Sequence, residues 1–223
     1  MLKRARIALA VTLFLTPTAF AQDGHFDASV NGGVAITNTS SGNSVVQSAT
    51  TGLNVFGTFR FKFRPKHSFI FNYGRSNNSQ TYLAVGDNFH VTNTIAEYTG
   101  AYVFSPFRKG GRFDPFFLAG GGALKFDPGS TWVFFPDLAN GTHNRVQVNL
   151  GAVKQTQLAF LYGLGVDYRL PKVSRLALRL QYRGLLYKAP DFKVDATGGS
   201  GVSFFTGARG HMAEPSIGLV FKF

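Results

Sequence analysis

The histidines are the first residues to consider for chemistry, because histidine serves both as a general base and as a metal ligand. The five histidines are spread along the chain, and none has the spacing of a metal-ligand pair such as H-x₃-H. His211 has the most suggestive neighbours, since Glu214 and Ser216 follow it closely and hydrolytic sites combine these residue types. A histidine near a loop end is more commonly structural. The sequence therefore predicts no catalytic residue, no metal site and no cofactor.

Two glycine-rich segments resemble phosphate-binding loops in composition alone. They are "GLGVDY" from Gly163 and "GGG" from Gly120. Both lie inside segments with strand-like alternation and no helix follows either one, whereas a dinucleotide site needs a glycine-rich turn that leads into a helix. We therefore expect these glycines to let a neighbouring backbone or an aromatic ring approach closely.

The amino end has the three parts of a secretory signal peptide. Its basic region holds Lys3, Arg4 and Arg6, its apolar run extends from Ile7 to Leu15, and Ala19-Phe20-Ala21 is a small-x-small cleavage pattern. A membrane anchor is the alternative, but the apolar run is shorter than the roughly 20 residues that a spanning helix needs. The sequence predicts a signal peptide over residues 1–21, cleavage after Ala21, and one exported domain over residues 22–223.

The composition of the exported part limits its class. Charged residues make up only 15% of the chain, against about 25% in typical soluble proteins. The chain has no cysteine, so an exported domain must be stabilised by burial, by lipid or by a closed hydrogen-bond network. After residue 21 there is no apolar run of about 18 residues or more, which excludes a transmembrane helix.

The basic net charge bears on partners. The formal charge is +12, and it falls to +9 once Lys3, Arg4 and Arg6 are removed. The cations are scattered over turns and alternate strand positions, so we expect no nucleic-acid partner. Contact with anionic lipid headgroups or polysaccharide is one use for this charge, and hydration of the interior and the turns is the other.

Period-2 alternation of apolar and polar residues predicts eight strands. Short turns rich in proline and cations alternate with long connections rich in Asn, Ser, Thr and Gly, which is typical of an up-and-down meander. The predicted strands are Phe26–Thr37, Gly52–Phe63, Ser68–Arg75, His90–Phe104, Phe116–Phe126, Gln157–Arg169, Arg175–Tyr187 and Pro215–Phe223.

Each predicted strand has an apolar face and a more polar face. The polar faces carry seven charged residues, namely Arg60, Lys62, Glu97, Asp167, Arg169, Arg179 and Arg183. In the fifth strand we expect the larger side chains Phe116, Leu118, Leu124 and Phe126 to share the outer face, opposite Ala119, Gly121, Ala123 and Lys125. In the last strand Ile217, Leu219, Phe221 and Phe223 share the apolar face.

The solvent that meets the apolar face decides the fold class. A soluble barrel buries that face, whereas a membrane barrel turns it towards lipid and lines its interior with the polar face. Strand lengths near 9–11 residues, alternating loop lengths and the export signal favour the membrane version. So do aromatic residues near the strand ends, which would form interfacial girdles. These are Phe59, Phe61, Tyr73, Tyr102, Phe104, Tyr168 and Tyr187.

The predicted fold is an all-β, transmembrane, antiparallel, up-and-down β-barrel of eight strands. Its first and eighth strands must pair, because an open sheet edge in hydrocarbon leaves backbone groups unsatisfied. An eight-stranded barrel has an interior just wide enough to be filled by side chains. Interior charges must therefore be paired, and we expect Glu97 and Asp167 to pair with some of Arg60, Arg179 and Arg183.

The signal peptide, the eight alternating strands and the closing "IGLVFKF" together resemble small outer-membrane barrels of the OmpA/OmpX type. The resemblance covers essentially all of the exported chain and implies a cell outer-membrane location and a monomer. Its expected partners are outer-membrane lipid, lipopolysaccharide and the barrel-assembly machinery. By this resemblance Ile217, Leu219, Phe221 and Phe223 form a C-terminal assembly signal.

The sequence leaves three functions open. The first is a structural or surface-interaction role, in which long extracellular loops meet an external ligand. The second is a narrow pore for small solutes, and the third is a lipid-active barrel enzyme that would use His211 with Glu214 and Ser216. The longest predicted loop, Asp127–Thr156, holds the only tryptophan, Trp132. It either extends the barrel as a hairpin or folds over its mouth.

Overall fold

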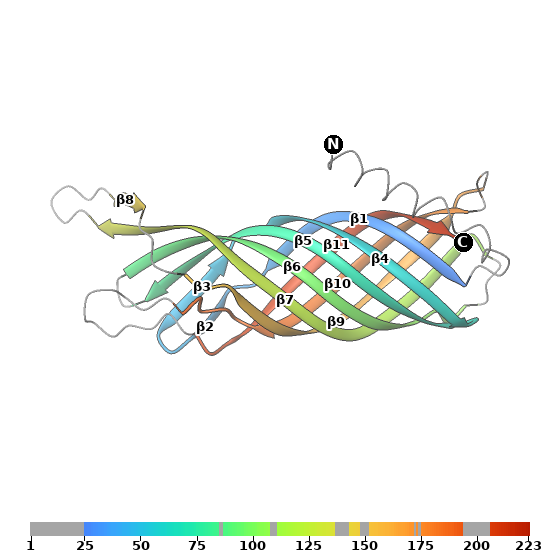
Figure 1. Cartoon of the computed structure of the whole chain (residues 1–223), viewed down its shortest axis with the longest axis horizontal. Helices are drawn as coiled ribbons and strands as arrows, with labels where there is room; N and C mark the ends of the chain where they lie inside the picture. The colour runs from blue at the N-terminus through green and yellow to red at the C-terminus, as the bar shows by residue number, and fades with distance from the viewer. Residues whose placement is uncertain are drawn as a thin grey trace, which may run out of the picture.

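The strands of this chain form a closed antiparallel barrel (Figure 1). The computed structural model describes residues 25–84, 87–107, 111–136, 143–147, 152–171, 173, 175–193 and 206–223. The predicted signal peptide, residues 1–21, lies outside these ranges and stays a prediction. Within the described residues, no helix is long and apolar enough to cross a bilayer.

Eight strands pair side by side around the barrel within the described ranges. In barrel order they are β1 (Phe26–Thr37), β4 (Gly52–Arg64), β5 (His67–Ala84), β6 (Asp87–Phe104), β7 (Phe113–Pro136), β9 (Gln155–Arg169), β10 (Leu176–Lys188) and β11 (Arg209–Lys222). The barrel closes because β1 pairs with both β4 and β11, so that Asp27 lies between Arg60 and Lys222 in register. The predicted fold class and the predicted pairing of the first and last strands are confirmed.

The two faces of the strands alternate as predicted on seven of the eight barrel strands. On β4, for example, Leu53 is 78% exposed whereas Asn54 is 2% exposed. The outward residues are large and apolar, and they include Phe59, Phe71 and Leu219. This outward surface, called here the apolar band, surrounds the barrel on the side nearer the C-terminus.

The facing predicted for the fifth strand is wrong. Phe116 and Leu124 on β7 are 1% and 0% exposed and lie inside the barrel, while Phe117 is 54% exposed and points outward. The prediction gave the larger side chains to the outer face, but a narrow barrel also needs large side chains to fill its interior. Tyr187, predicted for an outer girdle, is likewise buried and its ring lies 5.5 Å from that of Phe126.

Several strands continue well past the apolar band. The predicted loop Ser76–Phe89 is strand in β5 and β6, apart from residues 85–86, which lie outside the described ranges. The predicted loop Asn38–Thr51 contains β2 (Ser40–Gly42) and β3 (Val45–Ala49), and β3 pairs with β5. In the longest predicted loop, β7 continues to Pro136 and pairs with β8 (His143–Gln147), so the hairpin alternative is confirmed.

These additions form an extension at the end of the barrel opposite the C-terminus (Figure 1). Polar side chains lie on both faces of this part of the sheet, so the apolar–polar alternation that identifies a strand is weak there. That is why the sequence predicted loops.

Candidate functional site

The barrel interior holds a first group of charges, the Asp167 cluster, made of Asp27, Arg60, Lys62, Asp167 and Arg179. Arg179 donates two hydrogen bonds to Asp167, from Nε at 2.7 Å and from NH2 at 2.9 Å. Arg60 NH1 lies 3.3 Å from Asp167 Oδ2, and Lys62 Nζ lies 2.7 Å from Asp27 Oδ2. Three cations thus surround two carboxylates.

An aromatic ring supports the same cluster. The guanidinium carbons of Arg60 and Arg179 lie 4.7 Å and 5.2 Å from the centroid of the Phe116 ring. A ring face attracts a desolvated cation, so Phe116 contributes to holding two buried arginines in the barrel interior. This contact also explains why Phe116 points inward.

A second group, the Arg183 cluster, is made of Asn54, Glu97, Arg183 and Glu214. Arg183 forms a bidentate pair with Glu97, with NH1 and NH2 at 3.0 Å and 2.8 Å from the two carboxylate oxygens. Its NH2 group also donates to Glu214, and Asn54 donates to the other Glu214 oxygen at 2.6 Å. Arg183 therefore bridges two buried carboxylates that come from different strands.

The expected pairing of Glu97 and Asp167 with interior arginines is observed: Asp167 pairs with Arg60 and Arg179, and Glu97 pairs with Arg183. Of the charges predicted to lie inside, five are buried and two, Lys62 and Arg169, are partly buried. The buried five are Arg60, Glu97, Asp167, Arg179 and Arg183.

Among the described residues, two buried acids were missing from the predicted set. Asp27 is 0% and Glu214 is 1% exposed. Each of them occupies an inward-facing position in the alternation of its strand, so the alternation could have identified both. Asp27 is next to the strand start, and Glu214 precedes the closing segment that carried the clear alternation.

A third group closes the interior at the end with the extension. This Tyr82 plug is made of Gln47, Gln80, Tyr82, Pro190 and Phe192. The Tyr82 hydroxyl donates to the Pro190 carbonyl at 2.6 Å and accepts from Gln47 Nε2 at 2.9 Å. Phe192 is 0% exposed, and its ring meets that of Tyr82 edge-on at 6.4 Å. Sequence reasoning missed the plug, because all three of its segments, which hold Gln47, Tyr82 and Phe192, were predicted as loops.

The structure does not bring together the three residues that the enzyme alternative would use, His211, Glu214 and Ser216. His211 lies on the outer side of β11, where its Nε2 atom is 2.8 Å from the Tyr162 hydroxyl and its ring stacks on the Tyr162 ring. Glu214 and Ser216 are buried on the inner side. The strand therefore separates the imidazole from the carboxylate and the serine hydroxyl. Among the described residues, no group of three His, Cys, Asp or Glu side chains could hold a metal ion.

Residues 7–205 match the family described as outer membrane protein beta-barrel domain. The chain belongs to this family. It is an outer-membrane protein, and its apolar band accordingly meets lipid while its polar strand faces line the interior. No curated protein sequence matches the chain at a significant level.

Several solved outer-membrane proteins are similar to this chain at low sequence identity. Neisserial surface protein A is 16% identical, with 89% of this chain and 97% of that chain covered and a TM-score of 0.43. The outer membrane protein OprG from Pseudomonas aeruginosa is 14% identical, with coverages of 88% and 95% and a TM-score of 0.46. Ail of Yersinia pestis, in complex with the heparin analogue sucrose octasulfate, is 12% identical, with coverages of 88% and 99% and a TM-score of 0.44.

The Tyr82 plug of this outer-membrane barrel leads to a prediction on pH. Tyr82 lies beyond the apolar band, and burial raises the pKa of its hydroxyl well above the ordinary value of 10.0, with Tyr187 and Asp191 adding to the rise. The folded plug favours the neutral form of the Tyr82 hydroxyl. The stability that the neutral hydroxyl contributes is therefore complete below about pH 10 and is lost as the pH rises towards the folded-state pKa of Tyr82.

We expect Tyr82→Phe to lower the free energy of unfolding by about 1–3 kcal/mol at pH 8, because buried hydrogen-bond partners are left unsatisfied. The difference in unfolding free energy between the variant and the unaltered protein should shrink at pH 11. Only the unaltered protein contains the Tyr82 hydroxyl, so only it loses stability as the pH rises towards the pKa of that group. Urea unfolding of both proteins in detergent micelles measures this. A difference that stays the same at the two pH values would contradict the role given to the Tyr82 proton.

Proposed function

We propose that this outer-membrane protein is a sealed barrel that presents an extracellular surface for interaction, and not a pore. The observation that carries the proposal is the filled interior. The Asp167 cluster, the Arg183 cluster and the Tyr82 plug follow one another along the axis. Four of their large side chains, Arg179, Arg183, Tyr82 and Phe192, are each less than 2% exposed. A solute would have to displace paired charges at two levels and an aromatic plug at a third.

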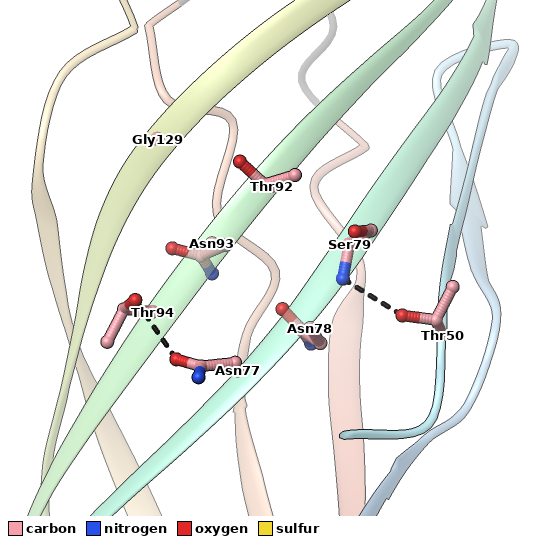
Figure 2. Close-up of a pocket in the computed structure, with 8 residues that line it drawn as sticks. All are labelled: Thr50, Asn77, Asn78, Ser79, Thr92, Asn93, Thr94 and Gly129. Atoms are coloured by element: carbon pink, nitrogen blue, oxygen red, sulfur yellow. Dashed lines mark hydrogen bonds between the residues drawn. The ribbon is translucent and has the colours of Figure 1, made fainter. Parts of the chain in front are cut away.

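The extension supports the surface-interaction part of the proposal. Outside the apolar band, β5 and β6 present neutral polar side chains around a shallow depression of about 350 Å³ (Figure 2). Several hydrogen bonds order it. Among them, the Ser79 main-chain N–H donates to Thr50 Oγ1 at 2.9 Å, and Thr94 Oγ1 donates to Asn77 Oδ1 at 3.1 Å. Hydroxyl and amide groups of this kind suit a partner that is recognised by hydrogen bonds.

We extend the proposal to orientation and partners. The turn between β4 and β5, at Arg64–Lys66, and the C-terminus would lie on the periplasmic side, and β2, β3 and β8 would lie outside the cell. Lipopolysaccharide would surround the outer part of the apolar band. The outward residues Ile217, Leu219, Phe221 and Phe223 would be recognised by the barrel-assembly machinery, which is in line with the exposure of the first three.

Because the chain has no cysteine, single cysteines can test this orientation on intact cells. Ser48 on β3 and Lys66 in the β4–β5 turn are both exposed. We expect a membrane-impermeant maleimide to label Ser48→Cys on intact cells. The matched variant Lys66→Cys should be labelled only after the cells are lysed.

Labelling of Lys66→Cys but not Ser48→Cys on intact cells would show that the orientation is reversed.

The sealed interior has its own test in planar bilayers, where stepwise conductance by the purified protein would overturn it in favour of a narrow pore. The two results are independent, so each part of the proposal can fail alone.

A further inference from the structure

The outer surface of β9, β10 and β11 has a groove at the edge of the apolar band nearest the extension. The groove has a volume of about 490 Å³ and is lined by Leu158, Phe160, Leu186, Lys188, Gly207 and Arg209. A volume of this size is within the range of small-molecule sites. Leu158 is 83% and Phe160 is 52% exposed, so the floor of the groove is open to whatever surrounds the barrel.

The charged and apolar side chains of the groove are arranged in order along the barrel axis. Lys188 and Arg209 are direct cross-strand partners at the ends of β10 and β11, and both are exposed. Leu186 precedes Lys188 at the next outward position, and its cross-strand partner on β9 is Phe160. Two cations therefore stand side by side directly above an apolar floor.

We propose that this groove binds one phosphorylated lipid of the outer leaflet. Lys188 and Arg209 bind the phosphate, and an acyl chain lies over Leu158, Phe160 and Leu186. Arginine offers a planar fork to phosphate oxygens and lysine offers a compact charge. The apolar floor continues into the band that meets lipid. A phosphorylated lipid has a negative headgroup next to an apolar chain, and this order matches that of the cations and the apolar side chains in the groove.

This inference rests on the proposed orientation, because it places the cations at the level of the outer-leaflet headgroups. It goes further by assigning a discrete site with named ligands. Two other exposed cations offer a comparison. Arg75 and Lys125 lie on the outer surface, each in register with Ala96 on the strand between them. Neither of them lines the 490 Å³ groove.

The test is a titration of the purified barrel with bisphosphorylated lipid A in neutral detergent, followed by native mass spectrometry. We expect the double variant Lys188→Gln with Arg209→Gln to weaken lipid A binding about 25-fold, because each cation near a phosphate contributes about fivefold to the affinity. The matched double variant Arg75→Gln with Lys125→Gln removes the same charge away from the groove and should lose much less. Equal losses in the two double variants would overturn the proposal in favour of general charge attraction.

The apolar half of the site has a separate test. Leu158→Gln should weaken binding of lipid A while both cations remain. Inositol hexakisphosphate, which has phosphates and no acyl chain, should bind far more weakly than lipid A. Equal binding of the two compounds, or full lipid A binding by Leu158→Gln, would overturn the lipid assignment. Unchanged heat-modifiable gel mobility confirms that each variant is folded, and Ser48→Cys labelling separates failure of this site from failure of the orientation.

Discussion

Replacing Arg183 with methionine is expected to lower the free energy of unfolding of the barrel by about 3–5 kcal/mol, the usual effect of removing one partner from a buried ion pair. Arg183 is 0% exposed and binds the carboxylates of both Glu97 and Glu214. Its guanidinium carbon also lies 3.6 Å from the centroid of the Phe56 ring. The variant would leave two buried carboxylates without their cation. Equilibrium urea unfolding in detergent micelles measures the loss.

The control restores charge balance without restoring the arginine. In Arg183→Met combined with Glu97→Gln and Glu214→Gln, no buried charge is left unpaired, so most of the lost stability should return. Arg75→Met, at an exposed position on β5, should change the free energy of unfolding by no more than about 0.5 kcal/mol. A triple variant no more stable than Arg183→Met alone would show that packing, and not charge pairing, sets the contribution of this side chain.

Replacing Gly122 with valine is expected to destabilise the barrel by about 3 kcal/mol or more, at the upper end of what overpacking causes. Gly122 on β7 is in register with Thr99 on β6. A Cβ atom at this position would lie 2.1 Å from the Tyr98 carbonyl oxygen and 2.6 Å from the Thr99 Cα atom. These are backbone atoms of a paired strand, so they cannot move aside as a flexible side chain would. The measurement is the yield of heat-modifiable folded protein together with its urea midpoint.

Gly32 on β1 is the matched control for this substitution. A Cβ atom at Gly32 would meet nothing within 4 Å, so Gly32→Val should change stability by no more than about 0.5 kcal/mol. Similar losses in the two variants would mean that the barrel rejects valine at strand glycines in general. In that case the close approach of β6 and β7 at Gly122 would not be the cause.

The "GGG" segment shows how far sequence reasoning could go. Its position inside an alternating segment excluded a phosphate loop and predicted close packing by a neighbour, and the structure places the β6 backbone against Gly120 and Gly122. The same strand shows the limit. Alternation identifies two faces but does not say which one is inside, and β7 has large apolar residues on both.

The extension shows a second limit, with a different cause. The sequence from Ser76 to Thr81 carries no apolar residue, so both faces of β5 are polar at that height. Alternation depends on a difference between the two solvents that the faces meet. Where that difference disappears, a strand and a loop look alike in sequence.

The sequence by itself determined the class of this protein, the eight spanning strands and most of the residues whose charges line the interior. It could do so because lipid on one face and a narrow polar interior on the other impose a period of two on every spanning strand. Only the tertiary structure decided which charges meet. Arg183 and Glu97 are 86 residues apart in the chain, and the curvature, stagger and closure of the sheet set their bidentate contact. The same closure positioned the Tyr82 plug over the interior and placed Lys188 beside Arg209 above an apolar groove.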